Sequence, residues 1–182
     1  LRQNGADTNR YAIYLSGVGS TSLPGGVQVA GNDFSDSSYG VRINNIANLI
    51  ISDGSVPGTH INLTDGNGNH TLTTASGVAL HLFNNDDNTT LSRLDLSWYG
   101  SASRSGYGLY VEPGGNTNDN LAISNVIVQN RNYGLYLGST TNANINCSTM
   151  LNNLEGIWLQ SSSTGAVVAN NHFQGNTRGV RW

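Results

Sequence analysis

Residues 107–111 read Tyr107-Gly108-Leu109-Tyr110-Val111, and close copies follow as Tyr133-Gly134-Leu135-Tyr136-Leu137 and Glu155-Gly156-Ile157-Trp158-Leu159. Each copy has a glycine as its second residue, followed by an aliphatic residue, a large residue and a second aliphatic residue. Four further copies, two of them looser, begin at residues 11, 39, 76 and 178. A strand pattern that returns seven times in 182 residues predicts a coil with one such strand in every turn.

The spacing of the copies indicates which kind of coil forms. Their glycine positions lie 22 to 37 residues apart, which is too short for a helix and a strand in every repeat. In the shortest turns Asn170, Phe173, Asn176 and Gly179 fall three residues apart, and alternating polar and apolar stretches run between such markers. The sequence therefore predicts an all-β protein, a parallel β-solenoid of about seven coils, in which each turn has two or three very short strands.

Four segments lengthen individual turns: residues 56–74, 84–90, 100–105 and 113–120. They are rich in Gly, Asn, Ser and Thr, the residues of turns. Since the strand positions are shared with the turns above and below, we expect these insertions to leave the stack at its corners as side loops.

Composition and charge favour one domain over residues 1–182 and exclude several classes of protein. No shift in composition marks a domain boundary, and the chain opens in what resembles the middle of a coil, which predicts a processed product or a segment of a longer chain. Its net charge is −3, it has no lysine, and its eight arginines are scattered, so no surface for nucleic acid is predicted. No apolar run is long enough to span a membrane.

The glycine-aliphatic-x-aliphatic strand, the asparagine at the preceding corner and the turn of about 22 residues together resemble a known group. They are similar to the right-handed parallel β-helix of the pectate-lyase-like superfamily, especially the repeat region shared by NosD-like periplasmic proteins, polysaccharide lyases and epimerases, and phage tailspikes. The resemblance covers Tyr11 to Trp182. It implies the architecture and its handedness, and an extracellular or cell-surface location, but no particular chemistry, because enzymes, adhesins and inert stalks share this fold.

In the repeated strand, the residues beside the aliphatic ones are predicted to face outward. The predicted outer column is Tyr14, Arg42, Ala79, Tyr110, Tyr136, Trp158 and Arg181, and the column beside it is Ser16, Asn44, His81, Glu112, Gly138 and Gln160. Two hypotheses fit this face. It is either a platform for sugar rings, with Tyr110, Tyr136, Trp158 and Gln160 as the glycan-binding candidates, or a ladder of side chains that stabilises the sheet.

Catalytic candidates on this face are Arg42, His81, Tyr110 and Glu112. Their residue types suit a polysaccharide lyase, in which Arg42 would neutralise a uronate and His81 or Tyr110 would accept the proton. No specific motif of the characterised lyases, epimerases or polygalacturonases of this fold is present, so the sequence favours a protein that is not an enzyme.

Metal and cysteine signals are weak. Asp65-Gly66-Asn67-Gly68-Asn69 begins like a calcium loop, but the later glycine and glutamate of such a loop are absent. Asp65, Asp86 and Asp87 are the candidate Ca²⁺ ligands, and no other cofactor is predicted. Cys147 takes a corner position that asparagine occupies in neighbouring turns, which predicts a small buried corner residue.

Core-strand sequence runs to the end of the chain, at Gly179-Val180-Arg181-Trp182, and the first ten residues leave little room for a capping helix. The predicted function is therefore an extracellular structural or surface module that continues a longer β-helix or assembles with itself, end to end, into a fibre. The alternative is a carbohydrate-active β-helix, a lyase or a binding module, whose partner is an acidic polysaccharide. A trimeric, tailspike-like fibre also fits the architecture.

Overall fold

The computed structural model describes residues 11–20, 27–28, 39–52, 60–62, 77–84, 86–100, 103–113 and 116–182. This part of the chain forms strands and no helix. The strands are β1 (Tyr11–Ser20), β2 (Val27–Gln28), β3 (Tyr39–Ile46), β4 (Ile50–Ser52), β5 (His60–Asn62), β6 (Val78–Phe83), β7 (Thr90–Ser92), β8 (Tyr107–Val111), β9 (Asn118–Asp119), β10 (Ala122–Ser124), β11 (Ile127–Gln129), β12 (Tyr133–Leu137), β13 (Thr140–Thr141), β14 (Asn144–Asn146), β15 (Thr149–Leu151), β16 (Glu155–Leu159), β17 (Val167–Ala169), β18 (His172–Gln174) and β19 (Arg178–Arg181).

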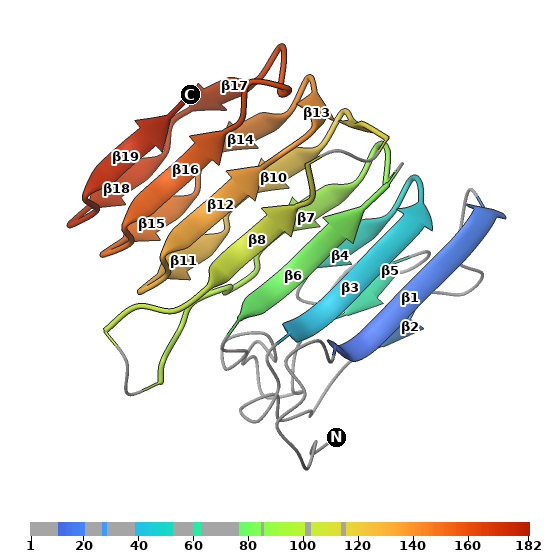
Figure 1. Cartoon of the computed structure of the whole chain (residues 1–182), viewed down its shortest axis with the longest axis horizontal. Coiled ribbons are helices and arrows are strands. Elements are labelled where there is room, and N and C mark those ends of the chain that lie inside the picture. The colour runs from blue at the N-terminus through green and yellow to red at the C-terminus, as the bar shows by residue number, and fades with distance from the viewer. Residues whose placement is uncertain are drawn as a thin grey trace.

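The strands stack as successive turns of one solenoid (Figure 1). The first sheet has the order β1-β3-β6-β8-β12-β16-β19, the second β17-β14-β10-β7-β4-β5-β2, and the third β11-β15-β18, while β13 pairs with β9. The pairs are parallel, as between β8 and β12 and between β10 and β14. The predicted all-β parallel solenoid is confirmed. Five returns of the chain connect β3 to β19, slightly fewer turns than the seven coils expected.

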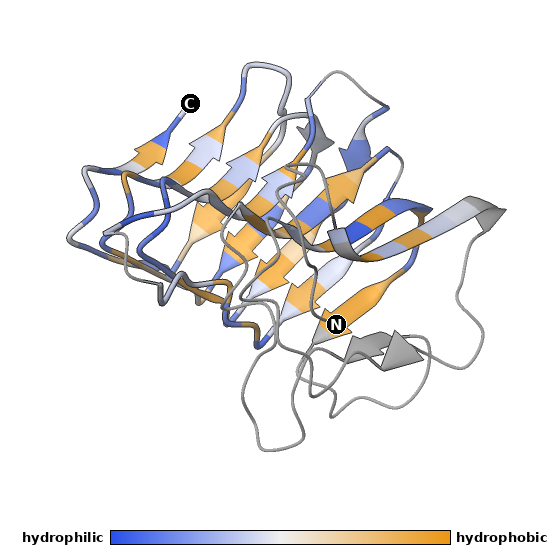
Figure 2. Cartoon of the chain, turned by 60° about the horizontal axis from the view of Figure 1, so that its bottom comes forward, coloured by the Kyte–Doolittle hydropathy of each residue, from blue (hydrophilic) through white to orange (hydrophobic). Residues whose placement is uncertain are grey.

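Aliphatic side chains from the sheets fill the space inside the coil. Leu109, Leu135 and Ile157 pair in register in the first sheet and are fully buried. Ile123 and Ile145 do the same in the second sheet. Figure 2 shows hydrophobic residues alternating with polar ones along these strands. The predicted alternation therefore builds a continuous core, and burial of each such side chain contributes on the order of 2 kcal/mol.

The corners depend on residues in the left-handed backbone region. One corner column is Arg93, Asn125, Cys147 and Asn170, with φ of 53°, 53°, 49° and 56°. Asparagine tolerates this conformation better than other residues with a side chain, which explains its abundance at corners. Cys147 keeps the predicted position but is exposed, so the prediction of a buried residue is wrong. A side chain at such a corner points away from the core.

A second corner carries a ladder of side-chain amides. Asn88 Nδ2 donates to Asn48 Oδ1 over 3.1 Å, and Asn120 Nδ2 donates to Asn88 Oδ1 over 3.0 Å. Asn142 extends the ladder with a longer bond of 3.5 Å to Asn120. Each amide can donate to one neighbour and accept from the other, so the ladder links consecutive turns at the surface.

A buried column of side chains joins the turns just before the first sheet. Asn153 Oδ1 accepts the backbone N–H of Arg131, and its Nδ2 donates to the carbonyl of Val128. Asn176 makes the same pair of bonds one turn later, to Asn153 N–H and the Met150 carbonyl. Arg131 replaces asparagine in this column, and its Nε donates to the carbonyl of Leu96 over 2.8 Å.

Two insertions contribute strands, contrary to the expectation that insertions would leave the stack as side loops. Strand β5, in the segment 56–74, lies between β4 and β2 in the second sheet. Its central residue Ile61 pairs with Ile51 and Val27, so three residues with an apolar centre are enough to fit the register. Strand β9, in the segment 113–120, pairs with β13.

Candidate functional site

The outer face of the first sheet brings the predicted site residues together, in a register that differs from the prediction at one strand. The observed column is Tyr14, Arg42, His81, Tyr110, Tyr136, Trp158 and Arg181. Ala79 had been placed in this column and His81 in the next one, and both placements are wrong. Tyr39 pairs with Val78, which moves β6 by two residues, and Phe83 lies beside Asn44 instead. A two-residue shift keeps every side chain on its own face, so alternation alone cannot detect it.

A second column on the same face was missed by sequence reasoning. It consists of the residues that precede the glycine position: Tyr11, Tyr39, Val78, Tyr107, Tyr133, Glu155 and Arg178. The rings of Tyr107 and Tyr110 are 4.8 Å apart, so they share a face although they are three residues apart. Alternation breaks at Gly108, whose Cβ, if present, would lie 2.6 Å from the inward Val128 side chain. The recurring tyrosine before the glycine was the available signal.

The aromatic residues of the two columns contact one another from turn to turn. Tyr107 and Tyr133 are stacked with ring centroids 4.7 Å apart, and the centroids of Tyr110 and Tyr136 are 5.2 Å apart. Trp158 meets the edge of Tyr136 at 5.1 Å, and Arg181 lies over Trp158 at 4.0 Å. Tyr136 is only 7% exposed and therefore belongs mainly to the ladder. Tyr110, Trp158 and Gln160 are partly exposed and remain glycan-binding candidates.

At the other end of the face lies a polar group of residues that we call the His81 cluster, formed by Tyr11, Arg42, His81 and Glu112. His81 Nδ1 is 3.1 Å from the Tyr11 hydroxyl, and His81 Nε2 is 2.9 Å from Glu112 Oε2. Arg42 Nη1 donates to the Tyr11 hydroxyl over 3.3 Å, and Arg42 Nη2 is 3.9 Å from Glu112. The ring of Tyr110 packs 5.0 Å from that of His81. The four predicted catalytic candidates are thus neighbours. Tyr11 is a fifth residue of this group, which had not been predicted as a candidate from the sequence.

Burial sets the protonation states in this cluster. His81 is 3% exposed, and burial, with a smaller effect of Arg42, lowers its pKa to about 4. Burial also raises the pKa of Tyr11, and it raises that of Tyr110 to about 12. At neutral pH the imidazole is therefore uncharged and both phenols keep their protons. His81 Nε2 and Arg42 Nε are buried without an aligned hydrogen-bond partner.

The carboxylates proposed as Ca²⁺ ligands are engaged at corners where the structure describes them. Asp86 is fully buried and accepts the backbone N–H groups of Ile46 and Phe83 at 2.8 and 2.7 Å, and burial raises its pKa to about 7. Asp87 Oδ1 accepts the N–H of Asp119 over 2.8 Å. Asp65 lies outside the described residues. Calcium at these loops stays a prediction.

A family model described as periplasmic copper-binding protein (NosD) matches residues 1–182. The chain belongs to the NosD family. The NosD-like resemblance predicted from the repeated strand is thereby confirmed. The periplasmic description of the family is consistent with the extracellular or cell-surface location expected from the sequence, and the cell surface itself stays a prediction. Neither the search of curated proteins nor that of solved structures returned a match.

The described residues contain no set of side chains suited to bind the copper that the NosD family description names. Copper sites use converging His, Cys or Met side chains. Here Met150 is buried in the core and Cys147 is exposed at a corner, while His81 and His172 lie on different sheets. The described ranges contain no group of three or more His, Cys, Asp or Glu residues that could hold a metal ion. They also contain no helix long and apolar enough to cross a membrane.

Proposed function

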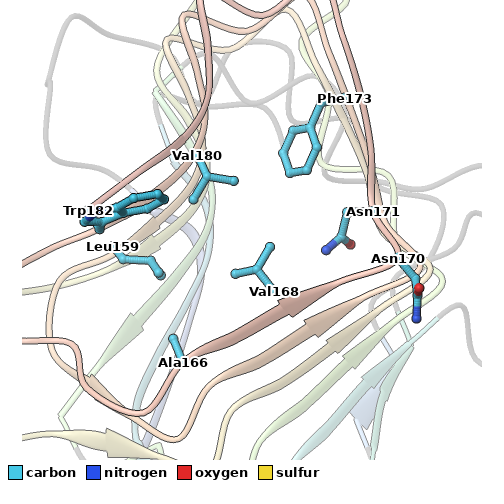
Figure 3. A pocket seen from close by; sticks show the side chains of 8 residues that line it. All are labelled: Leu159, Ala166, Val168, Asn170, Asn171, Phe173, Val180 and Trp182. Atoms are coloured by element: carbon cyan, nitrogen blue, oxygen red, sulfur yellow. The ribbon is translucent and has the colours of Figure 1, made fainter.

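We propose that this β-solenoid of the NosD family is a structural module that joins a second copy of itself end to end. The observation that carries the proposal is the face formed by β17, β18 and β19. It contains a cavity of about 420 Å³, which opens between the walls of the last turn (Figure 3). Its lining is mainly apolar: Leu159, Ala166, Val168, Asn170, Asn171, Phe173, Val180 and Trp182. Trp182 is 90% exposed.

This face also presents strand edges. Among the described strands, β19, β17 and β18 are each at the end of their sheet, so their outer backbone groups meet no further strand there. Unpaired edges next to apolar side chains favour addition of another strand. Another turn of the same solenoid would pair the three edges and cover the cavity at once.

The first strand of a second copy has the right residues for that position. Among the described strands, Ile13 is the first residue of the inward column that runs to Val180, and Tyr14 is the first of the outward column that runs to Arg181. Stacking β1 of one copy on β19 of the next would place Ile13 beside Val180 and Tyr14 beside Arg181. Arg42 already lies 5.5 Å from the Tyr14 ring in the same pairing. Such a head-to-tail contact does not close and extends into a fibre.

Sedimentation velocity tests the assembly. We expect elongated species whose size grows with protein concentration. Trp182→Ser removes exposed apolar surface, and Val180→Lys places a charge in the cavity, so each is expected to shift the equilibrium to monomer, about tenfold or more in the association constant. Thr117→Lys adds the same charge on an exposed residue in the turn of β10, two turns before this face, and should leave assembly unchanged. Circular dichroism would show that every variant is folded, and a parent chain that stays monomeric at all concentrations would contradict the proposal.

A second candidate function is binding of an acidic polysaccharide along the outer face of the first sheet. The observation that favours it is the pair of aromatic columns between Arg42 and Arg181, five strand spacings or roughly 24 Å apart. The charged residues of these columns and their edge are Arg42, Arg178, Arg181, Glu112 and Glu155, so this face is net positive on a chain of charge −3. Partly exposed rings suit the apolar faces of sugars, and the arginines suit carboxylates.

Electrophoresis through gels that contain alginate or pectate tests this binding. We expect the chain to be retarded relative to gels without polymer. Trp158→Ala should weaken retardation about tenfold, since it removes an aromatic contact worth about 1 kcal/mol together with its area. Tyr99→Ala is the matched control, because Tyr99 is an exposed aromatic residue outside the first sheet. Equal retardation of the parent and Trp158→Ala would remove the aromatic face as the binding surface.

A further inference from the structure

Aromatic rings on the outer face of the first sheet form a continuous series of contacts from β16 back to β8. The ring centroid of Trp158 lies 5.3 Å from that of Tyr133 and 5.1 Å from that of Tyr136. Tyr133 is stacked on Tyr107 at 4.7 Å, and Tyr107 lies 4.8 Å from Tyr110. All these distances are those of rings in contact. Electrons tunnel readily between such rings, and indole and phenol are among the side chains that lose an electron most easily, so the series is a path for one-electron transfer.

The series continues to β1 through His81. The imidazole ring lies 5.0 Å from the ring of Tyr110 and 5.8 Å from that of Tyr11, so only an imidazole separates the two phenols. Tyr14 follows at 6.4 Å from Tyr11, and its side chain is 53% exposed. Trp158, at the other end, is partly exposed. A soluble oxidant or reductant can therefore reach both ends of the path.

Tyr11 has a base at its hydroxyl group. His81 Nδ1 lies 3.1 Å from the Tyr11 oxygen, and burial, with a smaller effect of Arg42, lowers the pKa of His81 to about 4, so the imidazole is neutral. A phenol keeps its proton beside so weak a base, but a phenol that has lost an electron is a strong acid and gives the proton up. Glu112 Oε2, 2.9 Å from His81 Nε2, then offsets the repulsion between Arg42 and the imidazolium.

The rings between the two ends are poor places for a radical to stay. Burial raises the pKa of Tyr107 and Tyr136, and it raises that of Tyr110 to about 12, so these phenols hold their protons and an oxidised ring there would keep its positive charge. Arg181 lies over the Trp158 ring at 4.0 Å and disfavours a positive charge on the indole as well. A radical formed at Trp158 is therefore expected to pass through the middle rings and to come to rest where a proton can leave, at Tyr11.

We propose that the outer face of the first sheet is a relay for one-electron oxidation, in which a radical formed on Trp158 moves through the tyrosines to Tyr11. The oxidant is a one-electron acceptor, either an oxidising radical or a high-valent metal centre, which takes one electron from the indole. Each step returns an electron to one ring and removes one from the next. At Tyr11 the O–H proton moves to His81 Nδ1, which leaves a neutral tyrosyl radical beside an imidazolium. One electron from a soluble reductant at the exposed Tyr14 end and the proton from His81 restore the phenol.

Pulse radiolysis with azide radicals, which oxidise tryptophan first, tests the relay. The parent for this test carries Trp98→Phe and Trp182→Phe, so that Trp158 is its only indole. We expect the absorption of the tryptophan radical to decay as that of a tyrosyl radical grows. The rate of this conversion should not rise with protein concentration, because the electron moves within one chain.

Tyrosine-to-phenylalanine changes separate the relay from the packing of the aromatic ladder. Tyr133→Phe together with Tyr136→Phe keeps both rings in contact with Trp158 but removes the hydroxyl groups that make them oxidisable, so the concentration-independent conversion should be lost. Tyr99→Phe makes the same change outside the first sheet and should leave the conversion as it is in the parent. Circular dichroism would show that each variant keeps the solenoid.

Two further variants test the end of the relay. Tyr11→Phe removes the phenol at which the radical rests, and His81→Phe keeps an aromatic ring but removes the proton acceptor. Each should lower the yield of tyrosyl radical and lengthen the life of the tryptophan radical, a change that lost packing alone would not produce. Yields equal to that of the parent in both variants would overturn Tyr11 as the end of the path.

The relay as a whole has its own decisive results. A tryptophan radical that decays only through encounters between molecules would overturn it, and so would a conversion within the chain that survives the paired change at Tyr133 and Tyr136. Loss of the conversion in that pair, its persistence in Tyr99→Phe and the lower yields without Tyr11 or His81 would support it.

Discussion

Gly134→Ala is expected to destabilise the solenoid by about 3 kcal/mol, because the added methyl group meets backbone atoms and not a movable side chain. A Cβ on Gly134 would lie 2.4 Å from the carbonyl oxygen of Gly156 in the next turn. Strand β12 is held between β8 and β16 by parallel pairing, so neither backbone can move away without losing ladder hydrogen bonds. Chemical denaturation should show the loss, and the melting temperature should fall by roughly 6–12 °C.

Gly179→Ala is the matched control for this change. It occupies the same column in β19, but the nearest atom to its added Cβ is in the Phe173 ring at 3.6 Å, an ordinary contact. We expect a change of less than about 0.5 kcal/mol. Ala79 already occupies this column in β6, so the predicted cost belongs to the close approach in β12 and not to the column as such. Equal effects at both glycines would refute the explanation.

Arg131→Leu is expected to cost about 4 kcal/mol of the free energy of unfolding. Arg131 is fully buried, its Nε donates to the Leu96 carbonyl over 2.8 Å, and its Nη2 donates to the Ser97 carbonyl over 2.9 Å. Burial lowers its pKa to about 10, so it stays charged at neutral pH. Leucine fills much of the volume but leaves two buried carbonyl groups without these donors, at about 1–3 kcal/mol each.

Arg131→Asn separates this effect from simple loss of the charge. Asn153 occupies the same column one turn later, and its Nδ2 donates to the Val128 carbonyl as Arg131 Nε does to that of Leu96. Asparagine at position 131 can therefore serve one of the two carbonyls, and we expect about half the loss seen with leucine. Thermal and urea unfolding of the three proteins would measure the order. A leucine variant as stable as the parent would show that packing compensates for the missing donors.

Repetition made the architecture predictable from sequence, and register was the part that pattern could not determine. The strands from β8 to β19 align as their glycines predict. Strand β6 does not, since Gly77 suggested one alignment and the structure places Ala79 at the glycine position. Both alignments bury the same face of the strand, so only packing against β3 and β8 distinguishes them. The short strand β5 was missed because three residues carry too little pattern to stand out in a polar insertion.

The candidate site could be predicted in part. Arg42, His81, Tyr110 and Glu112 were expected on one face, and they are neighbours, because alternation within each strand settles which side chains point outward. Tyr11 was missed because strict alternation places the residue before the glycine position on the inner face, whereas the backbone there keeps two successive residues facing inward and turns Tyr11 outward. The contacts of Arg131 were beyond reach, since they depend on where the preceding turn places its carbonyl groups.

Side-chain hydrogen bonds link Arg131 to Asn153 in the next turn and Asn153 to Asn176 in the turn after it. The spacing of these residues has a genetic consequence. These steps are 22 and 23 residues long, and each ends where the next begins. An in-frame duplication of one such stretch would add a complete turn with its own core residues, corner residues and hydrogen-bond donors. It would lengthen the molecule by about 4.8 Å and would create no kind of contact between turns that the solenoid does not already have. A duplication that did not span a whole number of turns would break the register and put inward residues outside. The length of the solenoid can therefore change by whole turns when its gene changes by duplication.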